Sequence, residues 1–271
     1  MLERQRRGAL RSLHDTSASS GFQAHPRKLL FYLKSPHSRQ SSGRLASRRS
    51  FIKAHRMDYP HVTREHITLQ FLKDQRPQGF AYLDVYSYFE TGSRYFLIMS
   101  RIPGQLLEEA WPTLDETLRQ YYICKVADVC NNLAAWKGDS ISGVDGHQLW
   151  ERYLVRGNSK MADALSPQQL LKNCADMSMD VSTLVFYHCD LGPTNLLVGT
   201  STGSLGIIDW ELAGYVPIEW VRTKFRLSSG MNFNHGDENS RKDWRRRVAQ
   251  HLWATVMSWM RGGSFRITNR Q

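Results

Sequence analysis

The segment that most constrains the fold is 184–214, where short apolar runs alternate with single polar residues. The runs LVFY, NLLV and LGII are too short for helices, and tight loops separate them. Short continuous apolar runs bounded by turn residues are typical of buried β-strands. The segment therefore predicts a cluster of short buried strands, with a turn over Gly199–Gly203, whose loops hold polar side chains in fixed positions.

Four polar residues follow one another in this segment: His188, then Asp190, Asn195 and Asp209. Phosphoryl transfer uses such a set, because a carboxylate must align the attacking hydroxyl and accept its proton. One carboxylate and one amide oxygen are also suitable ligands for Mg²⁺. Two other interpretations stay open. Asp and Asn are common turn residues at strand ends, and HCD could belong to a zinc site, although no Cys or His pair at zinc spacing accompanies it.

The pattern HxDLxxxN followed by IDWE resembles the catalytic and metal-binding loops of the aminoglycoside phosphotransferase and choline-kinase-like family. The stretches GYVPIEW and MSRIPGQLLEEAW are similar to a fungal branch of that family, and the resemblance covers residues 50–260. It implies an α+β, protein-kinase-like bilobal fold, with a small strand-rich N-lobe and a larger helical C-lobe. It also implies ATP and Mg²⁺ as cofactors, Asp190 as the catalytic base, Asn195 and Asp209 as metal ligands, and His188 as a brace for the loop.

The same resemblance assigns nucleotide-binding residues to the N-lobe. Lys53 in SFIKAH matches the strand lysine that contacts the phosphates, and Glu65 matches the helix acid that holds this lysine. The segment 99–102 resembles the hinge whose backbone, at Ser100 and Ile102, receives the adenine ring. The alternative is that Lys53 ends a solvated basic run and that Glu65 is an ordinary surface acid.

The sequence shows no clear phosphate-covering loop in the N-lobe. The segment 41–50 contains one glycine, Gly43, and three arginines that could meet phosphate, and a flexible linker explains these residues equally well: Arg44, Arg48 and Arg49. Two functional hypotheses follow. The first is an active kinase that phosphorylates a hydroxyl of a small molecule. The second is a catalytically impaired, pseudokinase-like nucleotide-binding or scaffold protein with an altered N-lobe.

The positive charge of the chain is concentrated at its beginning. The formal net charge is +11, and residues 1–56 hold thirteen Lys and Arg against two acids, so the remainder is balanced. We therefore expect a disordered basic leader over 1–45, an N-lobe over 46–100, a hinge over 101–104 and a C-lobe over 105–271. A nucleic-acid or anionic-membrane binder is a third hypothesis that depends on the leader alone. We expect no nucleic acid on the folded domain, no membrane span and a cytoplasmic location, with a mitochondrial one as the alternative.

Other patterns predict further elements and roles. Helices are expected over 62–73, from a cap at Thr113 to about Trp136, from Ser166-Pro167, and over 237–260, and strands at 50–53, 81–89 and 95–99. The cysteines are expected to be free thiols. Trp210 and Trp220 are expected in the core, RKDWRRR at 241–247 on a charged helix face, and Glu211 and Glu219 either at a cationic substrate or in solvent.

Overall fold

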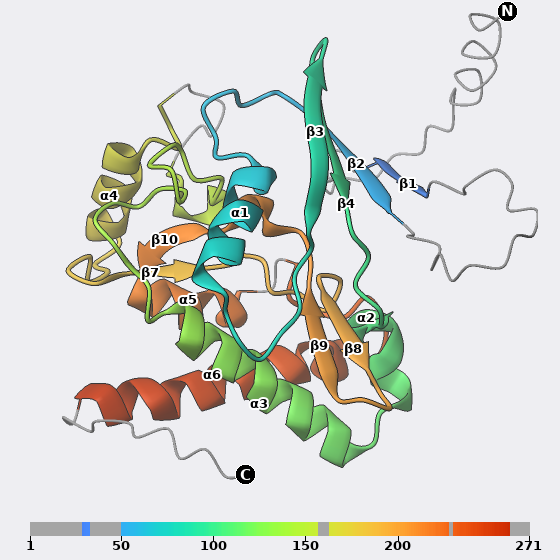
Figure 1. The fold of residues 1–271 in the computed structure, drawn as a ribbon. Helices are drawn as coiled ribbons and strands as arrows, with labels where there is room; N and C mark the ends of the chain where they lie inside the picture. The colour runs from blue at the N-terminus through green and yellow to red at the C-terminus, as the bar shows by residue number, and fades with distance from the viewer. Residues whose placement is uncertain (1–28, 33–49, 157–162, 228–229, 261–271) are drawn as a thin grey trace, which may run out of the picture.

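The computed structural model of the protein describes residues 29–32, 50–156, 163–227 and 230–260, with the backbone alone at 29–32 and 253–260 (Figure 1). Its first part, up to Met99, is built mainly from strands, and the larger part that follows is mainly helical. This arrangement confirms the predicted α+β class with a small strand-rich N-terminal part and a larger helical C-terminal part.

The N-terminal sheet is antiparallel and has the strand order β1-β2-β4-β3. Its strands are β1 (Leu29–Tyr32), β2 (Phe51–Arg56), β3 (Val85–Thr91) and β4 (Arg94–Met99). The helix α1 (Glu65–Gln75) lies between this sheet and the helical part. The strands and the helix that the sequence predicts here are present, with boundaries shifted by a few residues.

Strand β1 lies within the segment 1–45, for which the sequence predicts a disordered leader. Leu30 pairs with Lys53 and Tyr32 pairs with Phe51, so β1 extends the sheet. The prediction was wrong for LLFY. This short apolar run lies in a basic segment, and its partner strand β2 is separated from it by a long connection. The rest of the leader lies outside the described residues.

The helical part contains two small antiparallel sheets among its helices. One sheet has the order β10-β7-β6 and the other β5-β8-β9. In chain order the elements are β5 (Gln105–Leu106), α2 (Leu107–Ala110), η1 (Trp111–Thr113), α3 (Glu116–Leu133), β6 (Lys137–Gly138), η2 (Arg152–Leu154), α4 (Pro167–Asp176), β7 (Leu184–Tyr187), β8 (Leu196–Gly199), β9 (Ser204–Ile207), η3 (Trp210–Leu212), β10 (Gly214–Pro217), α5 (Ile218–Arg226) and α6 (Glu238–Met260). No helix in these described ranges is long and apolar enough to cross a membrane.

The hairpin β8–β9 is anchored to α3 at its turn. The amide of Gly203 donates to the Gly199 carbonyl at 2.7 Å, and Gly203 has a left-handed φ of 64°. The hydroxyl of Tyr121 donates to the Gly203 carbonyl at 3.0 Å, and that of Tyr122 to the Gly199 carbonyl at 3.1 Å. A Cβ at Gly203 would lie 2.9 Å from the Tyr121 hydroxyl oxygen, so this contact and the left-handed φ both favour glycine at the turn.

Several predictions for the helical part need correction. The N-cap of α3 is Asp115, whose carboxylate accepts the Leu118 amide at 2.8 Å, whereas Thr113 belongs to the preceding 3₁₀ turn; the helix also ends at Leu133. The segment 241–247 is not a uniformly solvated face. Arg245 is buried and donates to the carbonyls of Phe225 and Arg226, which end α5 and therefore need donors.

Other expectations for the core agree with the structure. Ser166 caps α4 with Pro167 as its first residue, and Trp210 and Trp220 are buried. All four cysteines are free. The core also contains an ion pair that the sequence does not reveal, between Lys224 Nζ and Glu151 Oε2 at 2.7 Å, with both side chains buried.

Candidate active site

The loop after β7 places His188 and Asp190 around a sharp bend. Cys189, between them, is buried and has a left-handed φ of 64°. His188 Nδ1 accepts the Asp190 amide at 3.2 Å, and its Nε2 donates to the Ile208 carbonyl at 3.0 Å. Burial lowers the pKa of His188, which agrees with a neutral ring that accepts at one nitrogen and donates at the other. His188 therefore joins the loop to the end of β9.

The side chain of Asn195 fixes the carboxylate of Asp190. Asn195 Nδ2 donates to Asp190 Oδ2 at 2.9 Å and to the Asp190 carbonyl at 2.8 Å. The other carboxylate oxygen, Oδ1, faces Gly230, where a Cβ would lie only 3.1 Å away. Glycine at this position therefore keeps a side chain away from this oxygen of Asp190.

The hairpin β8–β9 brings Asp209 beside this loop. The Ile208 amide donates to the Asn195 carbonyl at 3.0 Å, so Asp209 follows directly after the residue that pairs with Asn195. Asp209 has a left-handed φ of 71°, and the 3₁₀ turn η3 begins immediately after it. The structure therefore assembles the HxDLxxxN and IDWE motifs at one place.

Lys53 reaches the same place from β2. Its Nζ lies 2.5 Å from Glu65 Oε2 and 2.5 Å from Asp209 Oδ1, and Glu65 Oε1 accepts the Trp210 amide at 2.9 Å. Burial alone would raise the pKa of Glu65, but Lys53 and then the nearby His55 lower it to about 2. Burial alone would likewise lower the pKa of Lys53, but Asp209, Glu211 and Glu65 together raise it well above its ordinary value. The cluster is therefore a charged network that connects β2, α1 and the IDWE motif.

Two members of this network were not assigned to it from the sequence. Glu211 Oε2 lies 3.6 Å from Lys53 Nζ and 2.9 Å from His55 Nδ1, and the hydrogen bond with Glu211 raises the pKa of His55 against the opposing effect of burial. His55 gave no signal beyond its position two residues after Lys53, where alternation places both side chains on the same face of β2. Glu219 lies elsewhere, where it accepts the Asp180 amide at 3.3 Å.

The hinge connects β4 to the helical part beside β9. The Ser100 amide donates to the Asp84 carbonyl at 2.8 Å, and Ser100 Oγ accepts the Asp84 amide at 2.8 Å. The Ile102 side chain packs against Gly206 of β9, where a Cβ would lie 2.5 Å from it. The Ser100 amide is therefore already used within the protein.

Gly43 and the three arginines near it lie outside the described residues, but strand pairing limits where they attach. The connection between β1 and β2 begins after Tyr32 and ends before Phe51, and Phe51 pairs with Met99 next to the hinge. Lys53 pairs instead with Leu30, near the beginning of β1. Tyr32 and Phe51 therefore both lie on the side of the sheet that leads to Ser100.

The sequence matches the family model described as "Phosphotransferase enzyme family" over residues 39–220, about two-thirds of the chain. The chain belongs to this phosphotransferase family. The match includes the N-lobe residues Lys53 and Glu65 and the motif residues Asp190, Asn195 and Asp209. No curated protein matches the sequence significantly.

Two solved structures are similar to this protein, both at low sequence identity. The first is a thermostable mutant of the aminoglycoside phosphotransferase APH(4)-Ia in ternary complex with AMP-PNP and hygromycin B, with 15% identity, 87% of this chain and 79% of that chain covered, and a TM-score of 0.49. The second is the amicoumacin kinase hAmiN in complex with AMP-PNP, Ca²⁺ and Ami, with 9% identity, coverage of 91% and 73%, and a TM-score of 0.49.

The magnesium ion expected for a phosphotransferase of this family fits the donors present. Asn195 uses its Nδ2 to hold Asp190, which directs its Oδ1 away from that carboxylate. The Asp209 carboxylate lies one residue beyond the backbone pair of Ile208 with Asn195. An amide oxygen and a carboxylate oxygen are hard ligands of the kind that Mg²⁺ takes together with water and phosphate.

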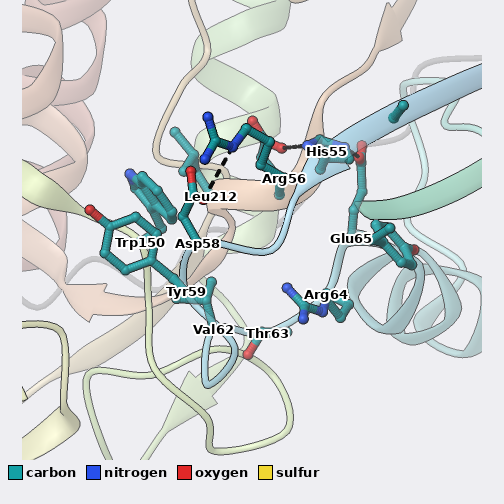
Figure 2. Close-up of a pocket in the computed structure, with 13 residues that line it drawn as sticks. His55, Arg56, Asp58, Tyr59, Val62, Thr63, Arg64, Glu65, Trp150 and Leu212 are labelled. Carbon is teal, nitrogen blue, oxygen red and sulfur yellow. Dashed lines mark ion pairs between the residues drawn. The ribbon is translucent and has the colours of Figure 1, made fainter. Parts of the chain in front are cut away.

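A pocket adjoins the Lys53 network from another side (Figure 2). His55, Glu65 and Glu211 separate it from Lys53, and Tyr59 and Trp150 form another wall, with their rings edge to face at 3.9 Å. Glu211, the last residue of IDWE, lines this pocket, whereas Asp190, Asn195 and Asp209 do not. The pocket therefore adjoins the place where the motifs converge, and it shares Glu65 and Glu211 with the Lys53 network.

Proposed function

We propose that the protein transfers the terminal phosphoryl group of ATP, in the presence of Mg²⁺, to a hydroxyl group of a small molecule. The observation that carries the proposal is the position of Lys53, held at 2.5 Å from both Glu65 and Asp209. A lysine held this way can turn towards nucleotide phosphates. Glu65 then still has His55 as a neighbour, with Nε2 at 3.7 Å from Glu65 Oε2. Membership of the phosphotransferase family supports the reaction class.

The surroundings of each assigned residue support the role that it has in this proposal. Asp190, fixed by Asn195, would align the acceptor hydroxyl and take its proton as the new phosphate ester forms and ADP leaves. Asn195 and Asp209 would hold Mg²⁺, which neutralises charge on the phosphates when bound. Lys53 would contact the phosphates, Glu65 would hold Lys53, and the hinge backbone at Ser100 and Ile102 would receive the adenine.

The binding part of this proposal is testable without knowing the acceptor. We expect ATP and Mg²⁺ together to stabilise the protein against thermal unfolding, by roughly 2.7 kcal/mol at about 100 times the dissociation constant. ATP or Mg²⁺ alone should give much less. Asp209→Ala should abolish the part of the shift that depends on Mg²⁺, because Asp209 is the only charged ligand assigned to the metal. Asp176→Ala, at the exposed end of α4, is the matched control and should respond normally.

An unchanged response in Asp209→Ala would show that the metal is held elsewhere, and the assignment of Asp209 would be wrong. Binding of Mg·ATP without ATP consumption over a panel of small alcohols and amino alcohols would favour the impaired, pseudokinase-like alternative. No response to Mg·ATP at all would contradict both forms of the proposal.

A further inference from the structure

Strand β3 exposes an unusual number of large aromatic side chains. Of the five large hydrophobic side chains that are exposed among the described residues, three lie on this strand: Tyr86 at 49%, Tyr88 at 53% and Phe89 at 46%. Strand β3 ends the sheet, and no described segment pairs with its outer side. The hairpin β3–β4 also projects beyond the other labelled helices and strands in Figure 1, so none of these covers its tip.

The aromatic rings of β3 lie on both faces of the sheet and are already ordered. Phe89 stacks on Phe96 of β4, its direct cross-strand neighbour, with ring centroids 4.9 Å apart and planes 9° from parallel. Tyr88 stacks on His66 of α1 at 3.7 Å and 17°. Rings that are held before binding lose little conformational freedom when a partner covers them. Exposed edge strands usually carry lysine or proline, which prevent pairing with other chains, and β3 has neither.

The charge on this edge argues for a partner that is neutral at the contact. Glu90 is the single charged residue of β3, and Arg64 lies 3.5 Å from it. Residues 1–49 carry eleven Lys and Arg against two acids, so this leader would bring strong positive charge to a surface that offers one carboxylate. A second copy of β3 brings aromatic rings and a single carboxylate, that of its own Glu90.

We propose that β3 pairs antiparallel with β3 of a second copy, so that the two N-terminal sheets become one sheet across a two-fold axis. A strand paired with itself about such an axis is self-complementary, as an isologous interface requires. If Phe89 lies on the axis, the Phe96–Phe89 stack continues into the partner's Phe89. Glu90 then lies opposite the partner's Tyr88, whose hydroxyl can donate to it, and Thr91 lies opposite the partner's Ser87. No like charges face each other, and each of these pairs is favourable across strands.

The mass of the full-length protein in solution tests the pairing. In sedimentation velocity from about 1 to about 100 µM, the range in which weak complexes dissociate, the protein should reach twice the chain mass of 31.3 kDa. Phe89→Lys should remain at the mass of one chain, because two lysines would face each other on the axis. Leu171→Lys is the matched control: Leu171 is 40% exposed on α4, and this variant should dimerise like the unaltered protein.

Cross-linking tests the register. Phe89→Cys should form a disulfide-linked dimer under mild oxidation that a thiol reductant reverses, because directly opposed residues bring their Cβ atoms within disulfide range. Leu171→Cys and the unaltered protein should not. A protein that stays monomeric, a dimer that Phe89→Lys leaves intact, or a Phe89→Cys variant that does not cross-link would each overturn the proposal. A monomer would mean that the leader or another molecule covers β3.

Discussion

Asn in place of Asp190 should reduce kcat by about 10²-fold or more, the scale of a positioned general base. The reason is local: Asn195 holds Asp190 Oδ2, and Oδ1 lies beside Gly230, which has no side chain. The substitution keeps the shape of the side chain and removes its ability to take a proton. Initial rates of ATP consumption, with an acceptor found in the panel of small alcohols, would measure the effect.

Three further measurements separate catalysis from folding in this variant. The melting temperature of Asp190→Asn should stay close to that of the unaltered protein, because Asp190 is only partly buried and an amide oxygen can still accept the Asn195 hydrogen bond. Its stabilisation by Mg·ATP should also persist. Asp176→Asn, the same chemical change at an exposed site, should retain full activity. Full activity in Asp190→Asn would exclude Asp190 as the base.

The strands and loops around Asp190 are the part of the fold that the sequence predicts best. The runs LVFY, NLLV and LGII form β7, β8 and β9 as expected, because a short apolar run between turn residues has few other ways to be buried. The turn at Gly199–Gly203 is also where glycine spacing places it. Local pattern was sufficient here because each strand pairs with a near neighbour in sequence or lies fully in the core.

Features that depend on contacts between distant segments were not predictable in the same way. Strand β1 pairs with β2 across a long connection, and the sequence of this connection did not indicate the pairing. Arg245 looks like one member of a basic run, and only the position of α5 shows that it caps carbonyl groups. His55 and Glu211 join the Lys53 network because β2 and η3 approach each other, which neither local sequence indicates. For Lys53 and Glu65, the sequence could name the residues but could not show whether they meet.

Methionine in place of Lys53 should destabilise the protein by about 3–5 kcal/mol at neutral pH, the cost of removing one partner from a buried ion pair. Glu65, Asp209 and Glu211 would then face one another without the ammonium group. The effect should depend on pH with a defined sign. The pKa of Glu65 is lowered to about 2 from an ordinary value of 4.5, so its contribution to stability is complete above about pH 4.5 and is lost as the pH falls towards 2. Urea unfolding of both proteins at pH 7 and pH 3 would show a smaller difference at pH 3.

The matched control for Lys53 is Lys224, the other lysine in a buried pair, 2.7 Å from Glu151. Lys224→Met should lose stability on the same scale, since its partner carboxylate is equally buried. The two variants should differ in their response to nucleotide. Lys53→Met should lose most of the stabilisation by Mg·ATP, because it lacks the cation assigned to the phosphates, whereas Lys224→Met should keep it. If Lys53→Met responded to Mg·ATP as fully as Lys224→Met, Lys53 would be a structural residue alone, and the phosphates would have to be held by another part of the chain.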